Sequence, residues 1–155
     1  MNADNIINFR RLTPNDAEAL SELMNQDSKD YNQYFVAFEF DKTTIENILT
    51  KAKNDLYYGV YWKEELTGFY MLRGFDEGYA IPSYGVYISS RFNNKGFGAL
   101  TLNHAISTCR LLGLKKLRLK VHKENTFALK QYVKFGFVET GFDEKINNII
   151  MHRDI

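Results

Sequence analysis

Two glycines that lie one residue apart, Gly96 and Gly98, mark the clearest candidate for chemistry in the chain. A strand is predicted before them at 84–88, where β-branched and aromatic residues gather, and a helix is predicted after them. The first backbone N–H groups of a helix have no partner within it, and the helix dipole favours negative charge there. Because glycine lets a ligand approach these amides, the turn predicts a cradle for a pyrophosphate.

The turn departs from two well-known phosphate-binding motifs. A P-loop has Lys and then Ser or Thr after its last glycine, whereas Ala99 and Leu100 follow here. The Rossmann fingerprint has a third glycine where this chain has Thr101. A tight turn that binds nothing is the alternative interpretation of the two glycines.

A second motif follows the glycine turn along the chain. Residues 121–137 carry five residues at a fixed spacing: Asn125, Ala128, Tyr132, Gly136 and Phe137. Together with the run 93–98, Asn-Asn-Lys-Gly-Phe-Gly, this segment resembles the two signature motifs of the GCN5-related N-acetyltransferases, the GNAT family. Asn93 stands where that family usually has Gln or Arg, and the shorter side chain is expected to weaken binding of coenzyme A modestly.

The resemblance implies an α/β fold in a single domain that covers residues 1–155. Its central sheet is expected to be mixed, mostly antiparallel and flanked by helices. Two adjacent strands, 84–88 and 116–121, are expected to splay apart and form the acetyl-CoA cleft. The chain has 155 residues and is 45% hydrophobic, which suits one domain with a real core.

The resemblance also implies how acetyl-CoA binds. Its pyrophosphate is expected on the turn residues Asn93, Asn94, Lys95, Gly96, Phe97, Gly98 and Ala99. Its pantetheine arm is expected to pair with the strand backbone at Val86 and Ile88, and the Ile88 N–H to polarise the thioester carbonyl. Asn125 is expected both to cap a helix and to contact the pantetheine or the departing sulfur. No metal is expected.

Tyr132 is the predicted general acid of an N-acetyltransferase. A phenol with an ordinary pKa of about 10 keeps its proton at neutral pH and can donate it to a leaving thiolate. The resemblance supports this role, because Tyr132 stands where the family signature has its tyrosine, between Asn125 and Gly136. In the alternative interpretation Tyr132 is a core aromatic on the apolar face of its helix.

The aromatic segment 31–40 is the predicted wall of the acceptor site. Tyr31 and Tyr34 would pack against the substrate, and Glu39 would supply a carboxylate for a cationic amine. The alternative is a helix or loop that only covers the edge of the sheet.

The general base stays unassigned. Several titratable side chains and a chain of waters are the candidates, the side chains being His122, Glu39, Asp76 and Glu77. Lys120 occupies the position where some family members carry Glu, which argues against acetylation of ribosomal-protein N-termini.

The predicted reaction is acetyl transfer from acetyl-CoA to a primary amine of a small molecule. A non-catalytic domain that senses acyl-CoA, and an enzyme that acetylates a protein or peptide amine, are the alternatives. The net charge of +1 argues against a nucleic-acid partner, and no polybasic patch indicates a membrane surface. The basic cluster at 110–120 is interpreted as a solvated edge, with a role near the phosphates of CoA as the alternative, and a homodimer is left open.

A cytoplasmic location is predicted. Cys109 is the only cysteine, so the chain cannot form an internal disulfide, and its place on an apolar helical stripe predicts burial. Residues 1–12 contain no apolar run typical of a signal peptide, and no run approaches the length of a membrane span.

Hydrophobic periodicity and turn residues predict the remaining elements. Strands are expected at 6–12, 56–62, 66–75, 80–89, 116–121, 137–140 and 148–153. Helices are expected to begin at Thr13, Asp41, Gly96 and Asn125. The apolar stripes of the last two helices include Leu112 and Val133, and Gly113 and Gly136 are expected to end these helices.

Overall fold

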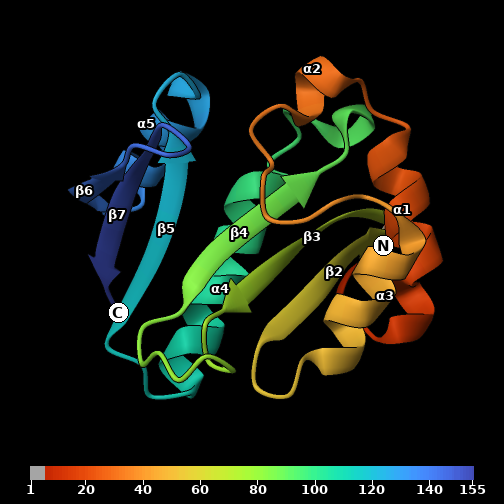
Figure 1. The fold of residues 1–155 in the computed structure, drawn as a ribbon, viewed down its shortest axis with the longest axis horizontal. Helices are drawn as coiled ribbons and strands as arrows, with labels where there is room; N and C mark the ends of the chain where they lie inside the picture. Colours follow the sequence, from red (N-terminus) through yellow and green to blue (C-terminus); the bar gives the residue numbers. More distant parts are fainter. Residues whose placement is uncertain (1–5) are drawn as a thin grey trace.

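One seven-stranded sheet organises the computed structural model, in the order β1-β2-β3-β4-β5-β7-β6 (Figure 1). The structure describes residues 6–155, and residues 1–5 of the predicted domain lie outside this range. The strands are β1 (Ile7–Arg11), β2 (Leu56–Trp62), β3 (Glu65–Arg73), β4 (Ser83–Ile88), β5 (Lys116–His122), β6 (Val138–Asp143) and β7 (Asn148–Asp154). All neighbouring strands run antiparallel except β4 and β5, which confirms the predicted mixed sheet.

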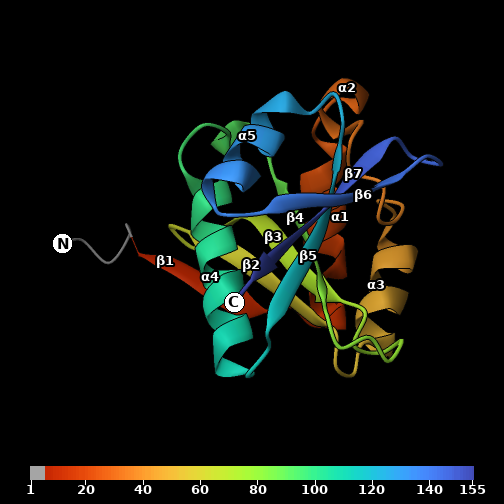
Figure 2. The ribbon, with the colours of Figure 1, turned by 90° about the vertical axis from the view of Figure 1, so that its left-hand side faces the viewer.

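Helices cover both faces of the sheet (Figure 2). They are α1 (Ala17–Asn25), α2 (Lys29–Asn32), α3 (Lys42–Lys51), α4 (Phe97–Leu111) and α5 (Thr126–Lys134). Side chains alternate between the two faces of a strand, so Phe69 and Met71 pack under α1 and α3, while Tyr70 and Leu72 pack under α4. The single α/β domain flanked by helices is therefore confirmed. Among the described residues, no helix is long and apolar enough to cross a membrane.

The parallel strands β4 and β5 separate soon after they meet. Only two residue pairs join them, Ser83 with Arg118 and Tyr84 with Leu119. Beyond these pairs the strands diverge toward their carboxyl ends, as Figure 1 shows. The predicted splay is confirmed, and it leaves one edge of β4 without a neighbouring strand.

Local signals place the helix ends as predicted. The Asp41 carboxylate accepts the Thr44 N–H at 2.9 Å at the start of α3, and the Asn125 side chain accepts the Ala128 N–H at 3.4 Å at the start of α5. Such caps satisfy amides that have no partner inside the helix. Cys109 is fully buried, as predicted.

Several predicted features differ from the structure. The strand expected at 80–89 begins only at Ser83, since proline at position 82 has no N–H for a ladder. The strand expected at 137–140 extends to Asp143, with an irregularity in register between Glu139 and Gly141. The segment 31–40 is mostly irregular after the short helix α2.

Two residues of the predicted apolar stripes are exposed. Leu112 is 54% exposed and Val133 is 58% exposed, so neither packs in the core. Periodicity marks which face of a helix can be buried, but the partner element decides how far along the helix that burial extends.

Candidate active site

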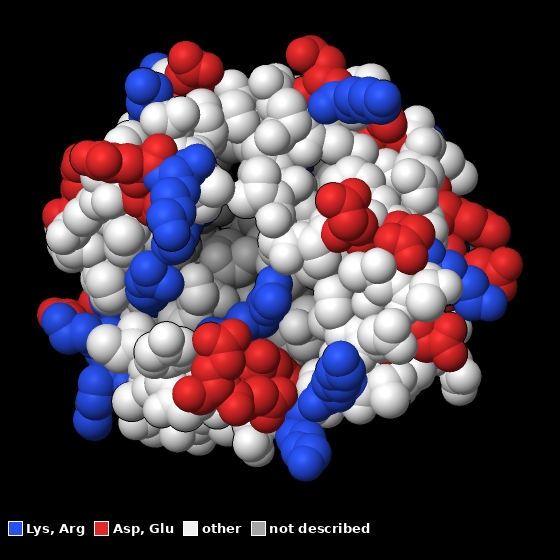
Figure 3. Space-filling view, in the orientation of Figure 1, with Lys and Arg blue, Asp and Glu red and all other residues white. Residues whose placement is uncertain are grey.

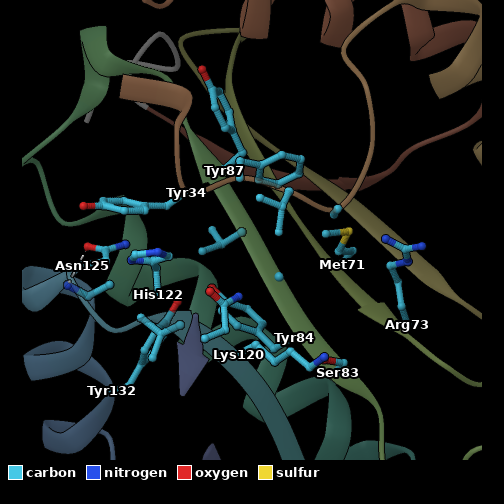
Figure 4. Close-up of a pocket in the computed structure, with 18 of the residues that line it drawn as sticks. Tyr34, Met71, Arg73, Ser83, Tyr84, Tyr87, Lys120, His122, Asn125 and Tyr132 are labelled. Carbon is cyan, nitrogen blue, oxygen red and sulfur yellow. Dashed lines mark hydrogen bonds between the residues drawn. The ribbon is translucent and has the colours of Figure 1, made fainter. Parts of the chain in front are cut away.

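A cleft of about 1360 Å³ occupies the space where β4 and β5 diverge. Residues from both strands, α2, α5 and the loops at either end of β4 line it. Figure 3 shows the corresponding hollow in the molecular surface, with Lys and Arg side chains at its border. Figure 4 shows side chains from both strands and from α5 directed into this space, with His122 on β5 and Tyr132 on α5.

The backbone edge of β4 faces this cleft. The Ser89 N–H donates to the Thr67 carbonyl of β3 at 2.9 Å. Successive amides of a strand point to opposite sides, so the Ile88 N–H points away from β3 and into the gap beside β5. The Val86 N–H has the same direction, because it lies two residues before Ile88. Both residues line the cleft, and this free edge can pair with an extended ligand.

The glycine turn follows the carboxyl end of β4 and opens α4. Gly96 has a left-handed backbone with φ of +92°, which glycine adopts without strain. Within the described part of the chain, the backbone N–H groups of residues 95–99 have no hydrogen-bond acceptor. A Cβ built at Gly98 would meet no atom within 4 Å. The turn therefore combines free amides with open space, which fits a diphosphate.

The structure divides the predicted cofactor-binding residues between two sides of the turn. Those that line the main cleft are Val86, Ile88, Asn93, Asn94 and Asn125. Lys95, Gly96 and Phe97 instead border a smaller hollow of about 610 Å³ beside Trp62. The Phe97 side chain is buried, so only its backbone N–H can meet a ligand, and Ala99 is half-buried.

Tyr132 projects from α5 into the cleft (Figure 4). Its ring packs edge-on against Tyr84 and Phe137, with centroids 6.5 and 5.9 Å apart. No residue in the range 6–155 forms a hydrogen bond with its hydroxyl group. Burial raises the pKa of Tyr132 to about 12, so the phenol keeps its proton at neutral pH.

The acceptor residues predicted from the aromatic segment have different positions. Tyr31 and Tyr34 both line the cleft. The Tyr31 hydroxyl donates to the Ile88 carbonyl at 2.6 Å, and the Tyr34 ring stacks on His122 with centroids 4.7 Å apart. Glu39 is exposed and is not among the residues that line the cleft.

The candidate bases also differ in their positions relative to the cleft. His122 and Glu77 line the cleft, although Glu77 is exposed at its rim. The Asp76 carboxylate accepts backbone N–H groups of residues 53–55, which lowers its pKa and makes it a structural acceptor. Of the four side chains, His122 is the one that belongs to a strand bordering the cleft and lines it.

Sequence reasoning missed a set of basic residues in the cleft. Arg118 and Lys120 were interpreted as part of a solvated edge, but both are half-buried and line the cavity. Arg73 and His152 line it as well. The sequence showed that Arg118 and Lys120 alternate with the apolar residues of their strand. It did not show the strand register that brings Arg73 and His152 beside Arg118.

Lys120 forms an ion pair with Asp143 at 2.8 Å. The same contact lowers the pKa of the Asp143 carboxyl group, chiefly through its hydrogen bond with Lys120. No group of three His, Cys, Asp or Glu side chains is placed to hold a metal ion within residues 6–155.

The comparisons with known proteins agree with this geometry. Residues 18–137 match the sequence model of the Acetyltransferase (GNAT) family, and this chain belongs to that family. Its fold is similar to that of a spermidine N-acetyltransferase from Vibrio cholerae in complex with CoA and spermine. That match has a TM-score of 0.80 and 22% identity, and covers 96% of this chain and 95% of the other.

Two archaeal structures share the fold at similar coverage. The PaiA N-acetyltransferase of Thermoplasma acidophilum, in complex with coenzyme A, gives a TM-score of 0.78 at 21% identity over 97% of this chain and 99% of that one. A domain from Methanocaldococcus jannaschii gives a TM-score of 0.81 at 16% identity, and the match covers 97% of this chain and 99% of that one.

Proposed function

We propose that the protein transfers the acetyl group of acetyl-CoA directly to a primary amine of a small molecule, with Tyr132 as the general acid. The observation that carries this proposal is the Tyr132 hydroxyl, which lies unpaired in a cleft bordered by the free backbone edge of β4. Membership of the GNAT family supports the reaction class.

Contacts for the diphosphate, the pantetheine arm and the thioester of the donor support this proposal. The free amides of residues 95–99 would bind the diphosphate, and the open space at Gly98 would admit it. The edge of β4 at Val86 and Ile88 would pair with the pantetheine arm as an added strand does. The Ile88 N–H would then polarise the thioester carbonyl, while the Asn125 side-chain amide N–H groups, which the helix cap leaves free, would contact the sulfur.

Proton transfer from Tyr132 to the leaving thiolate requires comparable pKa values. The pKa of Tyr132 is about 12, whereas an exposed thiol has a pKa of about 8.5. Apolar surroundings raise the pKa of a thiol as well. Partial burial of the thiolate beside Tyr84 and Tyr132 would therefore narrow the difference between the two pKa values and favour transfer of the proton from the phenol.

Thiol release from acetyl-CoA, measured against a panel of small amines, tests the proposal. We expect release with at least one amine class, and a turnover number about 10²–10⁴-fold lower in Tyr132→Phe, which keeps the ring but loses the proton donor. Calorimetry of the same variant should give an acetyl-CoA affinity within about twofold of the unmodified chain, because the hydroxyl acts only on the leaving group.

Tyr58→Phe is the matched control, since Tyr58 is a half-buried tyrosine of β2 that lies outside the cleft. Its turnover should stay unchanged. Binding of acetyl-CoA without thiol release from any amine would contradict the enzyme and favour the acyl-CoA sensor.

A further inference from the structure

A row of polar side chains crosses the sheet at the narrow end of the cleft. Arg73 on β3 pairs with Ser83 on β4, Ser83 pairs with Arg118 on β5, and Arg118 pairs with His152 on β7. Residues directly opposite one another in neighbouring strands point to the same face of a sheet. All four line the cleft, so they form one surface, which we call the basic row.

The basic row lies on the face away from α4 and α5. Neighbours of the row members along the strands face the opposite side of the sheet, because side chains alternate along a strand. These neighbours pack in the core under α4, and they include Leu72, Tyr84 and Leu117. Figure 2 shows α4 and α5 on one side of the sheet and α1 and α3 on the other. The core residues of α1 and α3 pack on β2, β3 and β4, so this face of β5 and β7 remains open as the floor of the cleft.

The two arginines of the row lack acidic partners. No carboxylate among residues 6–155 lies within 4.0 Å of Arg73 or Arg118, although both are half-buried. The acidic groups at the adjoining ends of β2 and β3 are already engaged: Asp55 accepts the Gly74 N–H at 3.0 Å and Asp76 accepts the Asn54 N–H at 2.7 Å. Half-buried guanidinium groups of this kind bind an anion well.

Acidic side chains of the cleft stay at its rim. Asp30 and Glu77 line the cavity, but both are exposed, Asp30 in α2 and Glu77 in the β3–β4 turn. Figure 3 shows acidic side chains grouped beside the hollow rather than inside it. Lys120, one alternation further along β5, adds a cation on the same face, and Asp143 offsets its charge.

The diphosphate of acetyl-CoA does not account for the basic row. The row crosses β4 at its first residue, Ser83, whereas the glycine turn follows its last residue, Ile88. At a rise of roughly 3.3 Å per residue, about 17 Å separates the two ends. The reacting end of the donor, beside Tyr132, would lie between them.

We propose that the acceptor is an amine that also carries an anionic group, a carboxylate or a phosphate, which binds between Arg73 and Arg118 beside the Ser83 hydroxyl. This inference rests on the proposed acetyl transfer and names its substrate class. The anion fixes one end of the acceptor, so that its amine points along β4 toward Tyr132. Cations around the site also favour the neutral amine over the ammonium ion, and only the neutral amine has the lone pair that attacks a thioester.

Matched pairs of acceptors test the proposal through thiol release. The carboxylate arm compares β-alanine with propylamine, the phosphate arm compares glucosamine 6-phosphate with glucosamine, and spermidine is the cationic arm. We expect at least one acceptor that carries an anionic group to exceed its partner without that group about tenfold or more in kcat/KM, and the arm that responds identifies the anion. Spermidine should be the poorest acceptor.

Two variants locate the effect. Arg73→Gln and Arg118→Gln should each reduce the preference for the anionic member about tenfold to hundredfold, the range for one lost charge-assisted hydrogen bond. Arg110→Gln is the control, because Arg110 is exposed at the end of α4 and outside the cleft, and it should keep the full preference. A preference for the acceptors that lack an anionic group, or a preference for the anionic group that both cleft variants retain, would overturn the proposal and leave acetyl transfer intact.

A binding measurement separates this proposal from the reaction itself. Burial, Arg118 and Lys116 lower the pKa of His152, and an anion bound beside it should raise that pKa. We expect β-alanine or glucosamine 6-phosphate, added with CoA, to raise the His152 pKa in an NMR titration, and Arg118→Gln to abolish the change. No change with either anion would contradict the basic row as a binding site even if thiol release occurs.

Discussion

The Tyr132 hydroxyl has no hydrogen-bond partner in the described chain, unlike the hydroxyls of Tyr70 and Tyr84, which belong to the core that Tyr132 packs against. Tyr70 is hydrogen-bonded to His104 at 2.6 Å, and Tyr84 to Thr101 at 3.1 Å, so both are fixed in the core. Tyr132 has only ring contacts, and its hydroxyl faces the cleft. A residue that keeps its proton and has no internal acceptor can donate to a ligand.

The raised pKa of Tyr132 predicts the form of the pH–rate profile. Because the pKa is about 12, the phenol stays protonated throughout the range in which ordinary amines lose their protons. Turnover should therefore rise with pH and show no decline below about pH 11. The measurement is kcat between pH 6 and about pH 10.5 with one amine substrate. A decline near pH 9 that disappears in Tyr132→Phe would contradict the assignment.

The glycine turn is the element on which the proposed binding of the donor depends. Gly98→Ala meets no atom within 4 Å in the protein, so the substitution should leave the free energy of unfolding unchanged or raise it by up to about 1 kcal/mol. The new methyl group would occupy the space beside the free amides. We expect the Kd for acetyl-CoA to rise about tenfold or more, measured by calorimetry.

Gly141→Ala is the control for this element. Its Cβ would make ordinary contacts with Ile150 in the hairpin of β6 and β7, away from the turn. An unchanged Kd in Gly98→Ala would show that the ligand does not approach the turn.

A buried tyrosine of β4 holds the segment 27–32, which contains the end of the α1–α2 loop and the helix α2. The Tyr87 hydroxyl donates to the Asp27 carboxylate and lies 2.8 Å from the Asn32 side-chain oxygen, while the Ser90 N–H donates to the same carboxylate at 3.1 Å. Burial, reinforced by Asp27, raises the pKa of Tyr87 far above its ordinary value. These contacts connect the start of α2 with the carboxyl end of β4, and so they would position the wall of the proposed acceptor site.

Tyr87→Phe should therefore destabilise the protein by about 1–3 kcal/mol, because it removes the hydrogen bond from the buried Tyr87 hydroxyl to the Asp27 carboxylate. Chemical denaturation gives the free energy of unfolding, and hydrogen exchange of residues 28–35 should increase as well. Tyr79→Phe, at a side chain that is 63% exposed, should change neither quantity. Equal effects of the two substitutions would show that the hydroxyl network contributes nothing.

Two cores on opposite faces of the sheet stabilise the whole molecule. Leu119 is fully buried in the core under α4, next to the point where β4 and β5 meet. Leu119→Ala should lower the free energy of unfolding by about 2–5 kcal/mol through lost burial and a residual cavity. Denaturant unfolding measures the change. Leu112→Ala, at an exposed leucine, should stay within about 0.5 kcal/mol of the unmodified chain, and a comparable loss there would contradict this division of the core.

Features specified by neighbouring residues could be predicted from the sequence. The glycine turn, the caps at Asp41 and Asn125 and the burial of Cys109 all depend on local chemistry. The splay of β4 and β5 was predicted only through the resemblance to a family. No local pattern indicates where two parallel strands stop pairing.

The basic row was missed because it depends on register between distant segments. Arg73, Ser83, Arg118 and His152 belong to four strands, and a shift of one residue in any pairing would turn a side chain to the opposite face. Sequence alone showed Arg118 as one of several basic residues near an exposed edge. Leu112 and Val133 were misplaced for a related reason, since burial depends on which element lies opposite.

A structure of the protein with bound CoA tests the central claim most directly. We predict that the diphosphate lies within hydrogen-bond distance of the amides of residues 95–99 and that the sulfur lies beside the Tyr132 hydroxyl, between β4 and β5. A diphosphate bound away from this turn, or a sulfur remote from Tyr132, would contradict the proposed cleft and its chemistry.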